Sequence, residues 1–242
     1  MLSAIRRHPV KGLGDEALQS VTLTAGRHVP WDRVWAVAHA RADLEDGGWV
    51  HCRNFLSQRG QPELARMGVA FDEAAGRLTL SHPLLGSLAL DPADDGALND
   101  WLAPIADPAR PGPYRLVRAS QPLTDFADTH VSIASMSSLR ALEQMAGREL
   151  ALIRFRMNLW IDGTAPWEEF DWVDREITIG PVRLKITDRD RRCAATNADP
   201  ETGRMNTDLT SVLYDRFGHM DFGVYAEVVA GGEVRVGDAV AA

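Results

Sequence analysis

Short apolar segments, interrupted by turn-forming residues, fill the first 90 residues of the chain. Apolar or alternating runs occur at residues 2–10, 18–24, 34–38, 67–71, 77–80 and 87–90, and glycine, proline or aspartate lies between them. Short strands at such close spacing are typical of β-barrels and β-sandwiches. We therefore expect a β-rich first part of the chain.

The second part mixes helix and strand patterns. Helices are predicted at residues 138–146 and 208–217, each ended by a glycine, and Ser137 or Ser138 is the expected N-cap of the first. Strands are predicted at residues 152–161, 176–179, 182–187, 222–229 and 233–236, with a hairpin turn at residues 230–233. The predicted class is mixed α and β, with strands predominating.

A proline-rich stretch separates the two parts. Residues 91–113 contain five prolines around a short helical candidate at residues 97–102. We interpret this stretch as a connection and predict two domains, at residues 1–113 and 114–242. A chain of 242 residues with 45% hydrophobic residues is large enough to bury a core without disulfides.

Composition excludes several classes of protein. The formal net charge is −8, whereas a dedicated nucleic-acid binder needs excess positive charge. Two cysteines, at positions 52 and 193, form neither a disulfide framework nor a cysteine-rich metal site. The sequence shows no signal peptide and no apolar run long enough for a membrane span. We expect a cytoplasmic protein that binds neither membrane nor nucleic acid.

Common catalytic motifs are also missing from the sequence. It contains no P-loop, no H-E-x-x-H, no G-x-S-x-G and no C-x-x-C. Residues 12–17 match the dinucleotide pattern G-x-G-x-x-A, but a strand-like run follows them where that pattern requires a helix. We therefore reject a dinucleotide site.

The most informative segment is DRDRRCAAT at residues 188–196. Three arginines lie within four residues of Cys193, and nearby cations favour a thiolate, which is a nucleophile and a soft metal ligand. A buried, inert cysteine beside a solvated charged run explains the segment about equally well. Cys52, between His51 and Arg53, is interpreted as an incidental thiol.

Other polar residues suggest a site for an anion. Lys11 follows the first predicted strand, and Arg33 lies in the segment WDRVW. Arg156 and Asn158 alternate along a predicted strand, so both can face one side. Ser137 and Ser138 begin a predicted helix, whose free N–H groups attract anions. Each is most often structural when taken alone, but together they favour a cationic pocket.

At this point the sequence resembles a known family. The matching segments are HPVKG (8–12), WDRVW (31–35), FLSQR (55–59), RFRMNLWIDG (154–163), RRC (191–193) with Thr196, DPETG (199–203) and FGVY (222–225). In this order they are similar to two-part MOSC proteins, such as the mitochondrial amidoxime reducing component and its bacterial relatives. The resemblance implies an N-terminal MOSC β-barrel region followed by a MOSC-type β-barrel domain with a few peripheral helices.

The resemblance also implies a cofactor and its ligands. In that family a molybdenum cofactor, Mo-molybdopterin, is held with a protein cysteine as a sulfur ligand of the metal, and Cys193 occupies this position. Pyridoxal phosphate binding is a further property associated with the domain. The family's cofactor contacts fall on nine residues here: Lys11, Gly12, Arg33, Ser137, Ser138, Arg156, Asn158, Arg192 and Tyr225. Gly12 is a departure, because relatives usually offer a serine hydroxyl there.

The implied activity is the reduction of N-oxygenated small molecules, such as hydroxylamines and amidoximes. The chain lacks the four cysteines of a plant-type iron–sulfur cluster, so electrons are expected from a separate ferredoxin- or flavoprotein-type partner. The alternative, from sulfurases with a MOSC domain, is a cofactor carrier or a sulfur-transfer protein with a persulfide on Cys193. A third reading is a non-catalytic binder of another phosphorylated small molecule.

Overall fold

A computed structural model describes residues 1–44, 49–90, 95–126 and 131–242. Part of the predicted turn at residues 43–48, and Pro92 of the predicted connection, lie outside the described residues. Strands predominate over helices in the described ranges, which confirms the predicted mixed, β-rich class. No helix in these ranges combines the length and the apolar character that a membrane span needs.

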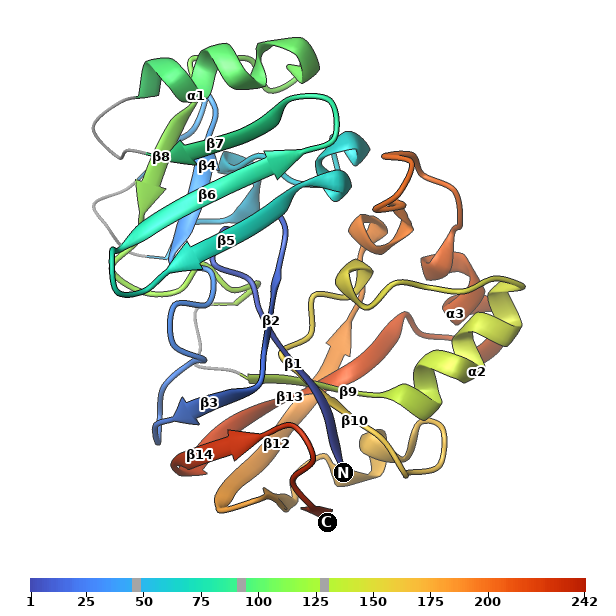
Figure 1. Ribbon diagram of the computed structural model, residues 1–242. Helices are drawn as coiled ribbons and strands as arrows, with labels where there is room; N and C mark the ends of the chain where they lie inside the picture. The colour runs from blue at the N-terminus through green and yellow to red at the C-terminus, as the bar shows by residue number, and fades with distance from the viewer. Residues whose placement is uncertain (45–48, 91–94, 127–130) are drawn as a thin grey trace.

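The largest sheet forms the lower body of the molecule (Figure 1), with strands in the spatial order β15-β11-β12-β13-β9-β10-β1-β2. In chain order its strands are β1 (Leu2–Arg7), β2 (Glu16–Leu18), β9 (Val131–Ser135), β10 (Leu159–Ile161), β11 (Glu176–Ile179), β12 (Val182–Arg191), β13 (Asp221–Ala230) and β15 (Val240–Ala241). Neighbouring strands are antiparallel except β9 and β10, which are parallel. Both faces bury apolar side chains, as the unbroken burial of β9 and β10 shows.

Smaller sheets build the upper body of Figure 1. They contain β4 (Trp35–Ala38) paired with β8 (Arg115–Arg118), and the meander of β5 (Gly68–Asp72), β6 (Arg77–His82) and β7 (Gly86–Leu90). Helix α1 (Asp95–Leu102) buries Leu98 and Leu102 in the same apolar cluster as residues of β5, β6 and β7. The strands predicted in this part of the sequence are confirmed to within a few residues.

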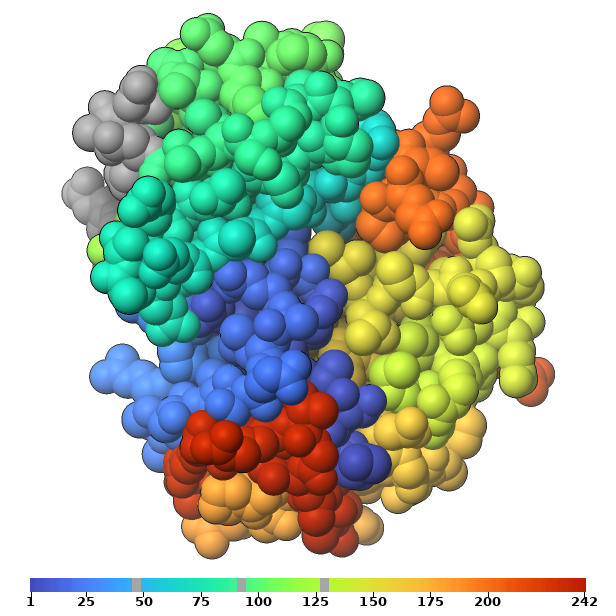
Figure 2. Space-filling model, in the orientation of Figure 1, coloured from blue at the N-terminus to red at the C-terminus, as the bar shows by residue number. Residues whose placement is uncertain are grey.

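Strand pairing joins the two ends of the chain. β1 pairs with β10, and β3 (Ser20–Leu23) pairs with β14 (Gly232–Arg235), so N-terminal strands complete the lower body. Figure 2 shows the blue N-terminal and red C-terminal segments in contact at the bottom of the molecule. The sheets therefore do not divide between residues 113 and 114, and the two-domain boundary stays a prediction.

Helices α2 (Met136–Ala146) and α3 (Leu209–Phe217) pack together at one side of the sheet. Gly147 and Gly218 end them in the left-handed conformation, as predicted. The predicted N-cap of α2 was wrong: Ser135, at the end of β9, accepts the free N–H groups of Ser137 and Ser138. The remaining helices are short 3-10 turns: Cys52–Asn54, Pro62–Arg66, Ala103–Ile105, Leu152–Arg154, Glu168–Trp172 and Ala194–Asn197.

Two predicted elements differ from the structure. Residues 152–161 are not one strand, because a 3-10 turn comes first and Arg156 has a φ of 53°, which leaves only β10 extended. The predicted hairpin at residues 230–233 is also wrong, since β14 pairs with β3 rather than with β13. Gly231 allows this departure: a Cβ there would lie 2.5 Å from the carbonyl oxygen of Leu23.

Gly223 is the position in β13 where an added side chain is expected to reduce the stability of the fold most. Its φ is +78°, and a Cβ would lie 2.6 Å from the backbone oxygen of Ile133 in β9. We expect Gly223→Ala to lower the free energy of unfolding by about 2–4 kcal/mol, the sum of left-handed strain and overpacking. Gly26→Ala is the matched control, because Gly26 has a φ of +66° but open space around it. Equal losses for the two variants in urea denaturation would contradict this account.

Candidate functional site

A pocket with a cavity volume of about 120 Å³ opens between the upper-body loops and the lower sheet. Eight of the ten residues expected at the site line it: Lys11, Gly12, Arg33, Arg156, Asn158, Arg192, Cys193 and Tyr225. These residues come from widely separated segments, which the fold brings together. Ser137 and Ser138 are not among the lining residues.

The pocket wall is strongly cationic, although the protein is acidic overall. Six basic side chains line it, against two acidic ones. The basic residues are Lys11, Arg33, Arg59, Arg154, Arg156 and Arg192, and the acidic ones are Asp125 and Asp190. Cations focused in a cleft raise the local concentration of anions, so the wall favours an anionic ligand.

Cys193 presents its thiol to this pocket. The residue is exposed, and its backbone is fixed because its carbonyl oxygen accepts hydrogen bonds from N and Oγ1 of Thr196, at 3.1 and 3.0 Å. The buried, inert alternative therefore does not apply. Of the three nearby arginines only Arg192 lines the pocket; Arg189 and Arg191 are exposed, and the Arg189 guanidinium lies over the ring of Phe170.

Cys52 lies in the same pocket wall, which its interpretation as an incidental thiol did not anticipate. It begins a 3-10 turn in the upper body, and its Sγ is 3.8 Å from Nδ1 of His51. Both cysteines of the chain thus border one cavity, although they are far apart in sequence.

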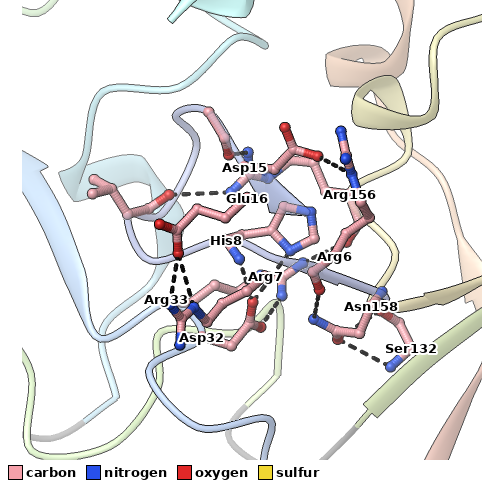
Figure 3. A network of polar contacts seen from close by, with 12 residues as sticks. Arg6, Arg7, His8, Asp15, Glu16, Asp32, Arg33, Ser132, Arg156 and Asn158 are labelled. Atoms are coloured by element: carbon pink, nitrogen blue, oxygen red, sulfur yellow. Dashed lines mark hydrogen bonds and ion pairs between the residues drawn. The ribbon is translucent and has the colours of Figure 1, made fainter. Parts of the chain in front are cut away.

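Arg33 is held at the pocket by a buried polar cluster (Figure 3). Asp32 accepts the backbone N–H of His8 at 2.7 Å and ion-pairs with the Arg33 guanidinium, and Arg33 also donates to the carbonyl oxygen of Arg156. Burial alone lowers the pKa of Arg33, but Asp32 and Asp125 raise it above its usual value. Arg33 therefore carries a fixed positive charge.

Arg156 and Asn158 use their polar atoms mainly within the protein. The guanidinium of Arg156 donates to the carbonyl oxygens of Val10, Leu13 and Gly14, at 3.1, 3.1 and 2.9 Å. Burial, with Arg33 nearby, lowers the pKa of Arg156 to about 10, so it remains protonated at neutral pH.

Asn158 is 2% exposed and bonds across the sheet. Its Oδ1 accepts from Oγ of Ser132 at 2.9 Å, and its Nδ2 donates to the carbonyl oxygen of Arg6 (Figure 3). Both Arg156 and Asn158 shape and brace the wall, while the thiol of Cys193 stays open to the pocket.

Arg192, Asp190 and Tyr225 form a second polar group in the pocket wall. Arg192 ion-pairs with Asp190 and donates to the carbonyl oxygen of Phe155. Burial raises the pKa of Asp190 to about 6, even though Arg192 opposes this shift. Burial and the carboxylates of Asp190 and Asp125 also raise the pKa of Tyr225. Two groups able to hold a proton therefore face the pocket.

Gly12, where the resemblance predicted a serine hydroxyl in relatives, lies in a tight turn. Its φ is +75°, and a Cβ would lie 2.7 Å from the carbonyl oxygen of Leu56. A serine there would strain this turn, so the backbone passes close to the loop of residues 56–57 only because glycine is present.

The two predicted serines are used elsewhere. Ser138 is buried, donates to Oε2 of Glu169 at 2.8 Å and accepts the N–H of Trp167. Ser137 accepts a hydrogen bond from Arg140. The start of α2 is thus satisfied within the protein by Ser135 and Glu169 rather than by a ligand in the pocket.

Two acidic wall residues were missed by the sequence analysis. Asp190 had a signal: β12 buries Val182, Leu184 and Ile186, and the same alternation returns at position 190. Asp125 had none, because its segment between β8 and β9 has no periodic pattern.

His8 gives the cluster a pH dependence. Burial, together with the charges of Arg156 and Arg33, lowers the pKa of His8 from 6.5 to about 3. The unfolded chain binds a proton here below about pH 6.5 and the folded protein does not until near pH 3, so folding is weakened as pH falls through this window.

We expect the stability of the wild type relative to His8→Asn to fall by about 2 kcal/mol between pH 6.5 and pH 5. The measurement is urea denaturation of both proteins at each pH. Comparing the two proteins cancels the opposite effect of Asp190, whose raised pKa weakens folding as pH rises from about 4 to 6. A pH-independent difference would show that His8 is not held neutral by the fold.

Comparison with known proteins matches both parts of the chain to family models. The model described as the MOSC domain matches residues 112–241, and the one described as the MOSC N-terminal beta barrel domain matches residues 1–100.

Individual relatives match over a smaller share. Mitochondrial amidoxime-reducing component 1 of Mus musculus is 30% identical over 122 residues, covering 45% of this chain and 35% of that protein. Molybdenum cofactor sulfurase of Drosophila pseudoobscura pseudoobscura is 28% identical over 110 residues, covering 45% of this chain and 14% of that protein. This chain thus spans about a third or less of these relatives' length. The crystal structure of the YUAD protein from Bacillus subtilis aligns over 99% of this chain and 92% of that one, with 10% identity and a TM-score of 0.47.

Proposed function

Because this chain belongs to the MOSC domain family, we propose that it binds a molybdenum cofactor in the pocket of Cys193 and reduces N-hydroxylated small molecules with it. The observation that carries the proposal is the exposed Cys193 thiol in a pocket lined by six basic side chains. The MOSC relatives include a protein named for amidoxime reduction, which supports the choice of substrate class.

The residues present fit such a cofactor. Cysteine sulfur is a soft ligand suited to a metal that also takes dithiolene sulfurs, and Cys193 offers one on a fixed backbone. A pterin phosphate needs cationic or N–H donors, and Lys11, Arg33 and Arg192 supply charge around the pocket. The missing Cβ of Gly12 lets the backbone form part of the wall at close range.

When bound, the cofactor supplies the two-electron redox chemistry, and the protein supplies position, charge and protons. Reduction of a hydroxylamine to an amine consumes two electrons and two protons and releases water. Asp190 and Tyr225 line the pocket and can hold a proton at their side-chain oxygens. Arg33 and Arg192 fix positive charge in the wall of the cavity.

The electron donor is proposed to be a separate ferredoxin- or flavoprotein-type protein, because the two cysteines of this chain cannot hold a four-cysteine cluster. Pyridoxal phosphate binding and a cytoplasmic location stay predictions. A borohydride-trapped adduct on Lys11, found by mass spectrometry after incubation with pyridoxal phosphate, would test the former.

A second candidate function is sulfur transfer or cofactor carriage through a Cys193 persulfide. It is favoured by the match to a protein named molybdenum cofactor sulfurase and by the accessible thiol. The two proposals differ in a measurable species, because only the second requires an extra sulfur on Cys193 and no turnover.

The test is to purify the protein from a host that makes the cofactor and to measure molybdenum and pterin per chain. Near-equal amounts of metal, pterin and protein are expected, followed by reduction of a simple hydroxylamine with a chemical electron donor. Absence of molybdenum under conditions in which a known MOSC reductase loads would contradict the proposal. A persulfide on Cys193 without reductase activity would favour sulfur transfer instead.

A further inference from the structure

Asp125 places a carboxylate over the cationic wall of the pocket. Its Oδ1 lies 2.6 Å from Nζ of Lys11, and the residue lines the cavity with its neighbours Thr124 and Phe126. Lys11 is 9% exposed in its side chain, whereas Asp125 is 62% exposed. The lysine is therefore fixed in the wall, and its acidic partner lies on the solvent side.

Three cations act on this single carboxylate. Its surroundings would raise the pKa of Asp125 by desolvation, but Lys11, Arg33 and Arg192 outweigh this and lower it below its usual value. These cations come from three separate segments of the chain. Asp125 thus lies where their fields converge, which is also where the wall would attract an anionic ligand.

The acidic partners of these cations differ in how firmly they are held. Arg33 is paired with Asp32 and Arg192 with Asp190, and both carboxylates are 3% exposed. Asp125 differs from them because its own carboxylate is largely in solvent and can rotate into water, which leaves the buried Lys11 in need of another anion. An anion in the pocket can take the place of Asp125 when it compensates the buried Lys11 charge at least as well.

Both neighbours of Asp125 in the chain make contacts with other segments. The carbonyl oxygen of Thr124 accepts from Nε1 of Trp49 at 3.0 Å, and the ring of Phe126 contacts Tyr225 edge-on with centroids 5.9 Å apart. The side chain of Asp125 can therefore move while its segment stays in place.

We propose that Asp125 is an internal counter-ion that competes with anionic ligands for Lys11, and so sets the affinity of the pocket for phosphate-bearing molecules. A dianionic or more highly charged group displaces it, because such a ligand gains more from three convergent cations than one carboxylate does. A monoanion gains no such advantage. The inference rests on the proposed function for the identity of the natural ligand. Before that ligand binds, Asp125 occupies the place of its phosphate beside Lys11.

The experiment measures binding of inorganic pyrophosphate to the cofactor-free protein by calorimetry. Asp125→Asn is expected to bind pyrophosphate about threefold to tenfold more tightly than the wild type. Asp215→Asn is the matched control, since it removes the same charge from an exposed position on α3 and should leave the affinity unchanged. Lys11→Gln should weaken binding and abolish the gain when combined with Asp125→Asn.

Each other outcome overturns the inference. Equal affinities of Asp125→Asn and wild type show that no competition occurs, and weaker binding by Asp125→Asn shows that Asp125 organises the site instead. Absence of pyrophosphate binding to either folded protein shows that the wall does not bind such anions. The molybdenum content of protein from the cofactor-producing host separates this test from the proposed function. If the wild type contains molybdenum but Asp125→Asn binds pyrophosphate no more tightly, only the counter-ion role is contradicted. If Asp125→Asn binds pyrophosphate more tightly but the wild type contains no molybdenum, only the proposed reductase function is contradicted.

Discussion

The Cys193→Ser variant is expected to contain no more than about a tenth of the molybdenum of the wild type and to lose reductase activity as a result. Serine keeps the size of the side chain but replaces a soft sulfur ligand by a hard hydroxyl oxygen. The fold should survive, because Cys193 is exposed and its backbone contact with Thr196 does not involve the sulfur. The free energy of unfolding of the cofactor-free protein should therefore change by less than about 0.5 kcal/mol.

Cys52→Ser is the comparison for this experiment, because it removes the other sulfur of the same pocket. Metal analysis of both variants, purified side by side, identifies which sulfur binds the metal. Equal loss of molybdenum from the two variants would contradict the assignment of the ligand to Cys193. A large loss of stability in Cys193→Ser would instead point to a structural role for the residue.

The local elements of the fold followed from the sequence more closely than their partners did. Strands such as β5, β6 and β7 lie between turn formers and pair with their neighbours in sequence, so pattern and topology agree. β3 and β14 were recognised as strands, but their pairing with each other depends on contacts across the whole chain. No local signal specifies such a pairing, which is why a hairpin was expected instead.

The site shows the same division between local and non-local information. Cys193 and Arg33 were identified from short motifs, and the structure brings both to one pocket. The two serines at the start of α2 were expected there because a helix N-terminus attracts anions. Ser135, one residue before the helix, already satisfies these N–H groups, and Glu169 takes the hydroxyl of Ser138.

Charge partners were the least predictable part of the site. Asp125 and Asp190 determine how the cations of the wall are balanced, yet Asp125 belongs to no recognisable motif and Asp190 was not identified as a wall residue within its arginine-rich segment. Their importance arises from burial and from distances between segments that are remote in sequence. A sequence can show that cations gather, but only the structure shows which of them are already paired.

The backbone turn that contains Arg33 is strained, and the contacts of Asp32 stabilise it. Trp31 and Arg33 have φ values of 64° and 53°, which cost residues other than glycine about 1–3 kcal/mol each. Asp32 counters this by accepting from the backbone N–H of His8 and by pairing with Arg33, and it is 2% exposed. One carboxylate therefore fixes both the turn and the charge that it presents to the pocket.

Asp32→Asn is expected to lower the free energy of unfolding by about 3–5 kcal/mol at neutral pH, because it leaves the Arg33 guanidinium buried beside Arg156 without its counter-charge. Urea denaturation measures this loss. Glu233→Gln is the matched control, since it removes an acid from an ion pair with Arg235 that is about half exposed, and it should cost less than about 1 kcal/mol. If the two variants lose the same stability, the Asp32 pair behaves as a surface pair, and Arg33 reaches the pocket without the help of this cluster.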